Sequence, residues 1–194
     1  MNKCGNENRS VRNTKKKLRD GLMRLLSEKP INEISVKELT ELADVNRGTF
    51  YFHYSDVYDM LRKIEDEFFN QFDQLLEGNL PAAGGNPAYS YLLTIFSFLG
   101  ENQDFCRVLL GQHGDIQFVN RVKHLVDGRC SGFWRQVVPE ADAKRFGMYN
   151  AFIINGCVGL IQNWLDGGLR ESPEEISQLA AAIISASLRP GITP

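Results

Sequence analysis

Close cysteine pairs are missing from this chain of 194 residues. Its four cysteines stand at positions 4, 106, 130 and 157, too far apart for the short Cys-x-x-Cys spacings of zinc sites and redox motifs. Scattered cysteines of this kind behave as small apolar side chains in a reducing compartment. We therefore expect no disulfide framework, no metal site and no other cofactor.

Long apolar runs are also missing. The N-terminal segment MNKCGNENRS lacks the apolar core of a signal peptide. The run LLTIFSFLG is much shorter than a helix that crosses a bilayer requires. These two absences predict a cytoplasmic protein with no membrane partner.

The sequence lacks the common catalytic motifs: a glycine-rich phosphate loop, His-Glu-x-x-His and Gly-x-Ser-x-Gly. His113 and Asp115, in the segment LLGQHGD, are the pair best suited to acid–base or metal chemistry. No further residues stand at ligand spacing, so we interpret them as helix caps and connections. The sequence favours a protein that is not an enzyme.

Positive charge is present, but it is unevenly distributed along the chain. The net charge is −2, yet eight Lys and Arg residues lie between Lys3 and Arg24, against only Glu7 and Asp20. Such asymmetry indicates either a solvated basic tail or a segment that meets an anionic partner.

Nearly every patterned segment has the helical period. Leu18, Leu22, Leu25 and Leu26 form one apolar stripe. We expect helices over about 12–28, 36–43, 47–54, 56–77, 88–100, 103–110, 115–138, 141–167 and 173–188. No run has sustained β alternation. The fold class is therefore predicted to be all-α, with a basic arm at 1–9, a small DNA-binding domain at 10–56 and a helical body at 57–194.

Two short predicted helices joined by a tight turn describe a helix-turn-helix motif. Ser35 to Glu38, SVKE, is a capping box that starts the first of them, with Val36, Leu39, Leu42 and Ala43 expected on its inward face. Asn46 is a good N-cap for the second. Phe50 and Tyr54 lie four residues apart and are expected to pack inward.

The opposite face of the second short helix has the chemistry of a DNA recognition helix. Arg47 can donate two hydrogen bonds to a guanine, and Thr49 and Phe52 can contact thymine methyl groups. Tyr51, His53 and Lys37 can bind phosphates, which fix register without reading sequence. The predicted DNA-binding residues are Ser35, Lys37, Asn46, Arg47, Gly48, Thr49, Tyr51, Phe52 and His53.

The segment SVKELTELADVNRGTFYFHYSDVYDML resembles the N-terminal signature of the TetR family of bacterial transcriptional regulators. The identical positions are Val36, Ala43, Val45, Gly48, Tyr51 and His53, and Ser35, Leu39, Asn46 and Tyr54 match by type. The resemblance covers about residues 14–61. It implies about nine helices in an Ω-like dimer, with the third helix of each subunit in a major groove.

Three positions depart from the family pattern. Asp44 replaces the usual turn glycine, although aspartate tolerates left-handed geometry better than most residues. Thr40 replaces a small alanine. Val57 replaces the family lysine that contacts phosphate, so that contact is not carried over.

The remainder of the chain resembles one C-terminal type in the same family. The segments FSFLGENQDFCRVLLGQHGD and GCVGLIQNWLDGGLRESPEEI are similar to regions of regulators from Gram-positive bacteria. One group of these regulators acts with dihydroxyacetone-kinase operons.

A regulator of this kind needs a dimer surface and an effector site. Glycines weaken helices, so Gly156 and Gly159 are explained by close helix approach, either between subunits or within one subunit. The predicted dimer residues are Gly156, Gly159, Leu160, Trp164, Leu179 and Ile183. The predicted effector-pocket residues are Phe68, Phe72, Phe96, Phe105, Trp134, Tyr149 and Phe152, with polar groups from Arg107, His113, Gln117 and Asn155.

Together these patterns predict a sequence-specific transcriptional regulator. We expect a repressor that binds a palindromic double-stranded operator as a homodimer and is released by an unknown small apolar effector. Two alternatives share the fold: an effector-independent DNA-organising protein and a transcriptional coactivator. A third alternative is a helical interaction protein with no DNA role. Salt would not change the result of a DNA-binding assay with such a protein.

Overall fold

The computed structural model describes residues 9–78, 87–110, 115–137 and 143–187. Within these ranges the chain forms nine α-helices and one short 3-10 turn, and no strand, which confirms the predicted all-α class. The helices are α1 (Arg9–Glu28), α2 (Val36–Leu42), α3 (Arg47–His53), α4 (Val57–Gly78), α5 (Pro87–Glu101), α6 (Gln103–Leu110), α7 (Ile116–Val137), α8 (Ala143–Asp166) and α9 (Pro173–Ser187), with the 3-10 turn at Ile31–Glu33. In the described ranges, no helix is long and apolar enough to cross a bilayer.

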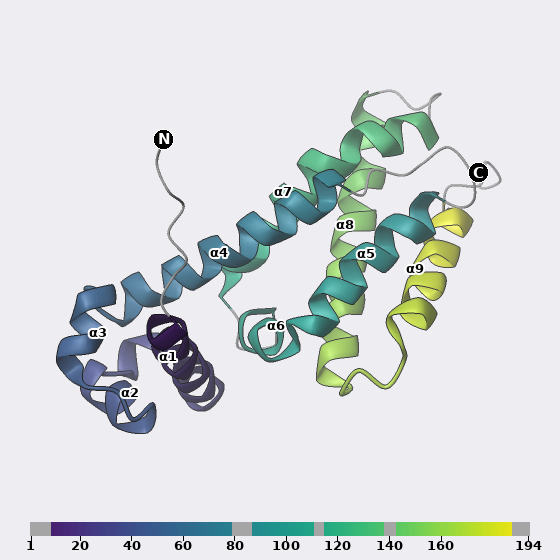
Figure 1. Ribbon diagram of the computed structural model, residues 1–194. Coiled ribbons are helices and arrows are strands. Elements are labelled where there is room, and N and C mark those ends of the chain that lie inside the picture. Colours follow the sequence, from purple (N-terminus) through teal and green to yellow (C-terminus); the bar gives the residue numbers. More distant parts are fainter. Residues whose placement is uncertain (1–8, 79–86, 111–114, 138–142, 188–194) are drawn as a thin grey trace. The chain divides into compact units, whose positions relative to one another are not determined.

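The chain divides into two compact units, and the first spans Met1–Phe68. In it, α1 packs on α2, and α2 packs on α3 (Figure 1). Its core contains Leu18, Leu22, Leu39, Phe50 and Met60, all with no exposed surface. Burial of each such side chain contributes about 1.5–3 kcal/mol to folding, so a small core suffices to hold the three short elements together.

The contact between α1 and α2 depends on a glycine. Gly21 is buried in the middle of α1, and a Cβ added there would lie 3.2 Å from Cδ1 of Leu39. Glycine within a helix costs about 0.5–1 kcal/mol relative to alanine. Here that cost is offset by close approach of α2, whose Leu39 and Ala43 are buried as predicted. Leu42 is 39% exposed, so its predicted inward orientation is wrong.

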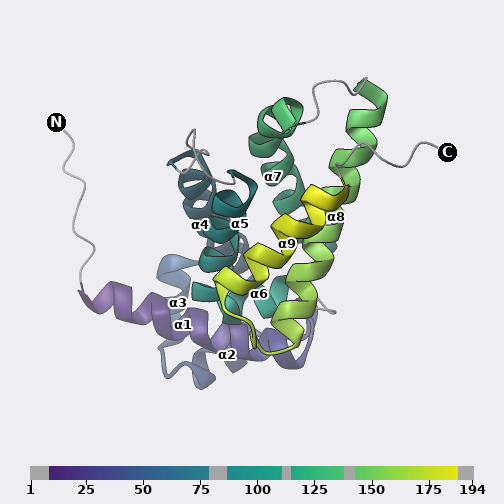
Figure 2. The same cartoon turned by 90° about the vertical axis from the view of Figure 1, so that its right-hand side faces the viewer.

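The second unit spans Phe69–Pro194. In this unit α5 lies along α9, and α8 packs against α6, α7 and α9 (Figures 1 and 2). Aromatic rings fill the space between these helices. Phe72 stacks on Phe98 with centroids 5.1 Å apart, and Phe96 meets Trp164 edge-on at 5.4 Å.

Helix α4 belongs to both units. Residues 57–68 lie in the first unit and 69–78 in the second. The compact units therefore meet within α4, whereas the predicted functional boundary lies at its start, between Asp56 and Val57. The sequence pattern explains the shared helix, because the buried Val57, Met60 and Ile64 continue at helical spacing into Phe68 and Phe72.

Candidate nucleic-acid interface and effector cavity

Side-chain caps position the two short helices of the first unit. Ser35 Oγ accepts a hydrogen bond from the Glu38 amide at 3.2 Å, as the capping box predicts. In the expected box the Glu38 carboxylate would accept from the Ser35 amide. Instead it pairs with Lys29, whose Nζ lies 2.7 Å from both carboxylate oxygens. The start of α2 is thereby tied to the segment that follows α1.

The turn between α2 and α3 is tight and left-handed. Asp44 has a φ of 51°, the conformation that the family pattern assigns to a glycine. Its carboxylate lies 3.5 Å from Lys17 Nζ, an exposed pair that contributes little to stability. Asn46 Oδ1 accepts a hydrogen bond from the Gly48 amide at 2.7 Å, which confirms the predicted N-cap of α3.

The rings of α3 divide into two sets, as the helical spacing predicts. Phe50 has no exposed surface, and Tyr54 at the C-cap is 7% exposed. In contrast, Tyr51 is 53% exposed and Phe52 is 81% exposed. A large ring that is mostly exposed is not needed for the core, so Phe52 is available to a partner.

The predicted DNA-binding residues come from the start of α2 and from α3. Ser35, Lys37, Arg47 and Gly48 are exposed, and Thr49 and His53 are partly exposed. Lys37 lies 4.0 Å from Glu41 in an exposed ion pair. Such a pair is weak in water, so a phosphate can readily take the place of Glu41 as the partner of Lys37. The outward surface of this motif is thus aromatic and cationic, with Arg47 at the first turn of α3.

A polar cluster that the sequence did not reveal holds the end of α3. Lys63 Nζ donates to the His53 carbonyl at 3.0 Å and to Asp59 Oδ2 at 2.9 Å, and Asp59 also accepts from the Ser55 amide at 3.1 Å. The hydrogen bonds from Lys63, Ser55 and Arg62 lower the pKa of Asp59 to about 2. Val57, in the place of the family lysine, is buried and faces the core.

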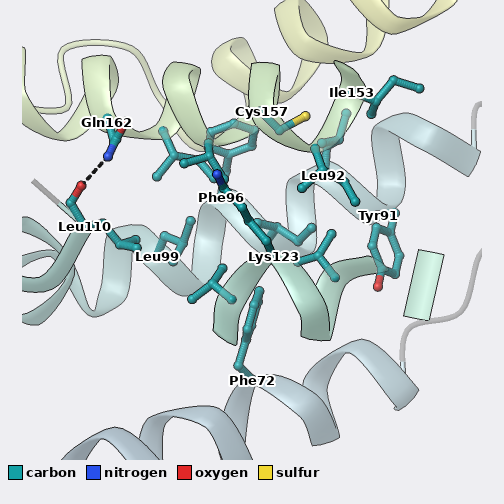
Figure 3. A pocket seen from close by; sticks show the side chains of 16 residues that line it. Phe72, Tyr91, Leu92, Phe96, Leu99, Leu110, Lys123, Ile153, Cys157 and Gln162 are labelled. Carbon is teal, nitrogen blue, oxygen red and sulfur yellow. Dashed lines mark hydrogen bonds between the residues drawn. The ribbon is translucent and has the colours of Figure 1, made fainter. Parts of the chain in front are cut away.

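The second unit contains an internal cavity of about 50 Å³. Figure 3 shows side chains of α4, α5, α7 and α8 around it. The lining residues are Phe72, Tyr91, Leu92, Ile95, Phe96, Leu99, Leu110, Val122, Lys123, Val126, Ile153, Ile154, Cys157, Val158, Ile161 and Gln162.

Only part of the predicted effector pocket lies at this cavity. Phe72 and Phe96 line it. Phe68 is buried in the first unit, and Phe105 is buried against Phe118, 5.6 Å between centroids. The side chain of Trp134 lies outside the described residues.

Two other predicted rings are surface residues. Tyr149 is 39% exposed and Phe152 is 63% exposed, so they do not line the cavity. The reason is that α8 is apolar on more than one face, and periodicity alone does not say which face is inside.

The polar groups at the cavity also differ from those predicted. Arg107 and Gln117 are exposed and do not line it, and His113 lies outside the described residues. Gln162 donates to the carbonyl of Leu110, the last residue of α6, at 2.7 Å. No local pattern in the sequence could have assigned Gln162 or Lys123 to the cavity.

A second apolar surface lies between α8 and α9. It is a groove of about 310 Å³ whose lining includes Phe152, Gly156, Gly159, Leu160 and Ile183. A Cβ added at either glycine would meet no described atom within 4 Å, so these glycines do not serve close packing within the described part of one subunit.

The two remaining predicted dimer residues differ in position. Leu179 is 49% exposed on α9. Trp164 is 2% exposed and donates through Nε1 to the Glu171 carbonyl at 2.9 Å. Trp164 is therefore a core residue of one subunit, and its assignment to the dimer surface is corrected.

A bidentate ion pair attaches the second part of α4 to α7. Arg129 Nε and Nη2 donate to the two oxygens of Asp73 at 2.7 and 2.8 Å. The hydrogen bond from Arg129 holds the pKa of Asp73 below its usual value. In the described ranges, no group of three or more His, Cys, Asp or Glu side chains is placed to hold a metal ion.

Two family models match the chain. The model of the tetR family of bacterial regulatory proteins matches residues 18–64, and a model of a transcriptional regulator C-terminal region matches residues 86–186. The first match contains α2, α3 and their caps, and the second contains α5 to α8 and most of α9.

Similar proteins come from several bacteria. The uncharacterized HTH-type transcriptional regulator YxbF of Bacillus subtilis is 23% identical over 171 residues, which are 87% of this chain and 44% of the relative. The chain therefore spans less than half of that relative's length.

Solved structures share the fold. A TetR transcriptional regulator from Streptococcus agalactiae is 20% identical, with a TM-score of 0.64 over 92% of this chain and 97% of that one. FadR of Bacillus subtilis, solved in complex with stearoyl-CoA, is 16% identical, with a TM-score of 0.62 over 92% of this chain and 99% of that one.

Proposed function

Because the chain belongs to the TetR family of bacterial transcriptional regulators, we propose that it is a repressor that binds a palindromic operator as a homodimer. In this proposal a small apolar effector enters the body of each subunit and releases the DNA. The functional domains are residues 10–56 for DNA and 57–194 for the effector and the dimer.

The observation that carries the DNA proposal is the exposed face of α3. Phe52 is 81% exposed while Phe50, two residues earlier, is fully buried. Arg47 lies at the N-terminal end of the same helix and is exposed. An arginine can read a guanine through two hydrogen bonds, and an apolar ring can contact thymine methyl groups. We assign sequence reading to Arg47, Thr49 and Phe52.

Other residues position the protein on the phosphate backbone. Lys37 and Ser35 lie at the start of α2, where exposed amides add to the attraction of an anion. Tyr51 and His53 flank the reading face and can donate to phosphate oxygens. The exposed Arg12 and Lys16 of α1 add attraction that does not depend on sequence.

The dimer proposal rests on the α8 and α9 surface. Phe152, Leu179 and Ile183 are exposed large apolar side chains on these two helices. Contiguous apolar patches on a monomer usually mark an interaction site. The open glycines 156 and 159 would let a second copy approach the α8 backbone closely. Two-fold symmetry then brings two α3 helices to two half-sites.

The effector proposal rests on the cavity and on α4. Phe72 of α4 forms part of the cavity wall, and the same helix continues back to Val57 beside α3. A cavity of about 50 Å³ is smaller than the 300–1,000 Å³ of ordinary ligand pockets, so a ligand must widen it. Widening would displace Phe72 and with it α4. An effector shifts the equilibrium only by its preference for the widened state.

One experiment tests the DNA proposal directly. Purified protein would select binders from random double-stranded DNA, and anisotropy titrations would measure affinity and stoichiometry. We expect an inverted repeat bound by two chains, with affinity falling steeply as salt rises. Selection that yields no preferred sequence would favour the DNA-organising alternative, and salt-independent behaviour would exclude a role on DNA.

A further inference from the structure

The wall of the cavity has charge of only one sign. Among the described residues that line it, Lys123 is the single charged side chain, and none is an aspartate or glutamate. Most of the other lining residues are aliphatic or aromatic. Lys123 is half-buried and its partner Asn155 is exposed, so the ammonium can meet the charged end of a ligand whose apolar part lies in the cavity. The wall therefore favours a ligand that is apolar over most of its surface and negative at one end.

Lys123 has a neutral hydrogen-bond partner. Its Nζ donates to Asn155 Oδ1 at 2.7 Å, from α7 to α8. The Asn155 amide nitrogen donates to the Ala151 carbonyl at 2.7 Å, which orients the amide oxygen towards the lysine. Among the described residues, no carboxylate lies within 4.0 Å of this ammonium. Within the described part of the chain, two of its three donors thus remain for a ligand and no ion pair cancels its charge.

The remaining polar groups add no negative charge. Burial raises the pKa of the Cys157 thiol to about 11, so it is protonated at neutral pH. Gln162 uses its amide nitrogen to satisfy the Leu110 carbonyl at the α6 end of the cavity (Figure 3). Between these groups the wall is made of Phe96, Leu99 and similar side chains.

The volume limits the size of the ligand. A cavity of about 150 Å³ accommodates benzene in a protein interior. The cavity here is about 50 Å³, so even a short aliphatic chain must widen it, and a long chain must widen it more.

We propose that the effector is a short aliphatic carboxylic acid, whose chain fills the cavity and whose carboxylate pairs with Lys123. The proposal rests on the proposed function, because it takes this cavity as the effector site. The carboxylate would accept from the donors of the ammonium that Asn155 does not use. A carboxylate adds the attraction of two opposite charges, which the neutral Asn155 amide does not supply.

Isothermal titration calorimetry on the full chain tests the proposal. The ligands would be butanoate, hexanoate and octanoate, each paired with the primary amide of the same length, at constant ionic strength. We expect the best carboxylate to bind about tenfold more tightly than its amide, or about 1.4 kcal/mol, since only the carboxylate adds an ion pair with the ammonium.

Three variants assign the difference to one residue. Lys123→Met keeps the apolar stem and should abolish the preference for acid over amide. Arg170→Met removes an exposed charge elsewhere in the same unit and should leave the preference unchanged. Asn155→Asp supplies Lys123 with a built-in carboxylate and should weaken the acids while sparing the amides. This third variant still tests the proposal if Lys123→Met does not fold.

Each contrary outcome has a distinct meaning. Equal affinity for acids and amides would overturn the carboxylate assignment and leave an apolar effector site in place. Acid binding that survives Lys123→Met would overturn the role of Lys123. No binding by any compound would overturn the proposal as a whole, while DNA titrations of ligand-free protein would still test the regulator function separately.

Discussion

Among the described residues, both α3 and α8 expose aromatic rings, and the neighbours of these rings differ. On α3, Phe52 and Tyr51 share the helix with the exposed Arg47, and the exposed Lys37 lies on α2, which packs against α3. On α8, Phe152 lies beside glycines and aliphatic side chains, and none of the described residues that line the adjacent groove is charged. Exposed rings mixed with cations suit the bases and phosphates of DNA. Exposed rings among small apolar residues suit another protein surface, because the cores of such interfaces are depleted in charge.

The largest expected effect contrasts a buried ring with an exposed ring on the same helix. Phe50→Ala should lower the free energy of unfolding of the first unit by about 3–5 kcal/mol, because it leaves a cavity in a fully packed core. Phe52→Ala, the matched control, should change it by less than about 0.5 kcal/mol. Urea unfolding followed by circular dichroism measures both. A similar loss for the two variants would show that Phe52 is also part of the core.

The next effect concerns the groove surface. Gly156→Leu should weaken the dimer by about 2–3 kcal/mol, because the added side chain separates the two copies. Gly128→Leu, on an exposed part of α7 with equally open surroundings, is the control. Sedimentation velocity over a range of concentrations measures the dissociation constant. Undiminished dimer stability in Gly156→Leu would place the interface elsewhere.

On the DNA surface, reading and positioning residues should behave differently. Arg47→Ala should cost about 1–3 kcal/mol on the operator and relax preference at one base pair of each half-site. Lys37→Ala should weaken all sequences similarly and lower the salt slope by about one unit. Anisotropy titrations at several salt concentrations separate the two. Equal losses on operator and random DNA for Arg47→Ala would remove its reading role.

The smallest expected effect is a dependence of stability on pH that arises from the polar cluster at Asp59. The lowered pKa of Asp59 means that its hydrogen bonds stabilise the folded state above pH 3.8, the ordinary pKa of an aspartate, and that this contribution is lost as pH falls towards about 2. Asp59→Asn should therefore flatten the acid side of the stability curve of the first unit. Asp166→Asn, exposed in the second unit, should not. Acid titration by far-UV circular dichroism compares them, and identical curves for wild type and Asp59→Asn would contradict the role of this cluster.

The sequence predicted the first unit more completely than the second. Helix starts at Ser35 and Asn46, the left-handed Asp44 and the inward rings Phe50 and Tyr54 are all local effects of side chains on nearby backbone or of helical spacing. Local chemistry is visible in a single sequence. The same reasoning missed the cluster at Asp59, because Lys63 reaches back ten residues to His53.

In the second unit the positions of the helices in the sequence were predicted well, but the face of each helix that is buried was not. Helix α8 is rich in apolar residues, and its sequence alone does not distinguish the core residue Trp164 from the exposed Phe152. The distinction depends on which neighbour covers each face, and that neighbour can be far away in the chain. Lys123 and Gln162 were missed for the same reason, since their partners Asn155 and Leu110 are 32 and 52 residues away.

Two residues of α8 belong to both apolar spaces of the second unit. Ile153 and Cys157 line the internal cavity and also the groove between α8 and α9. On the proposed assignments, a molecule that widens the cavity pushes on side chains that also border the partner subunit. Effector binding and dimer formation are then coupled. The factor by which the effector changes the affinity between subunits equals the factor by which dimer formation changes the affinity for the effector. The response to a given amount of effector would consequently depend on how many copies of the protein the cell holds.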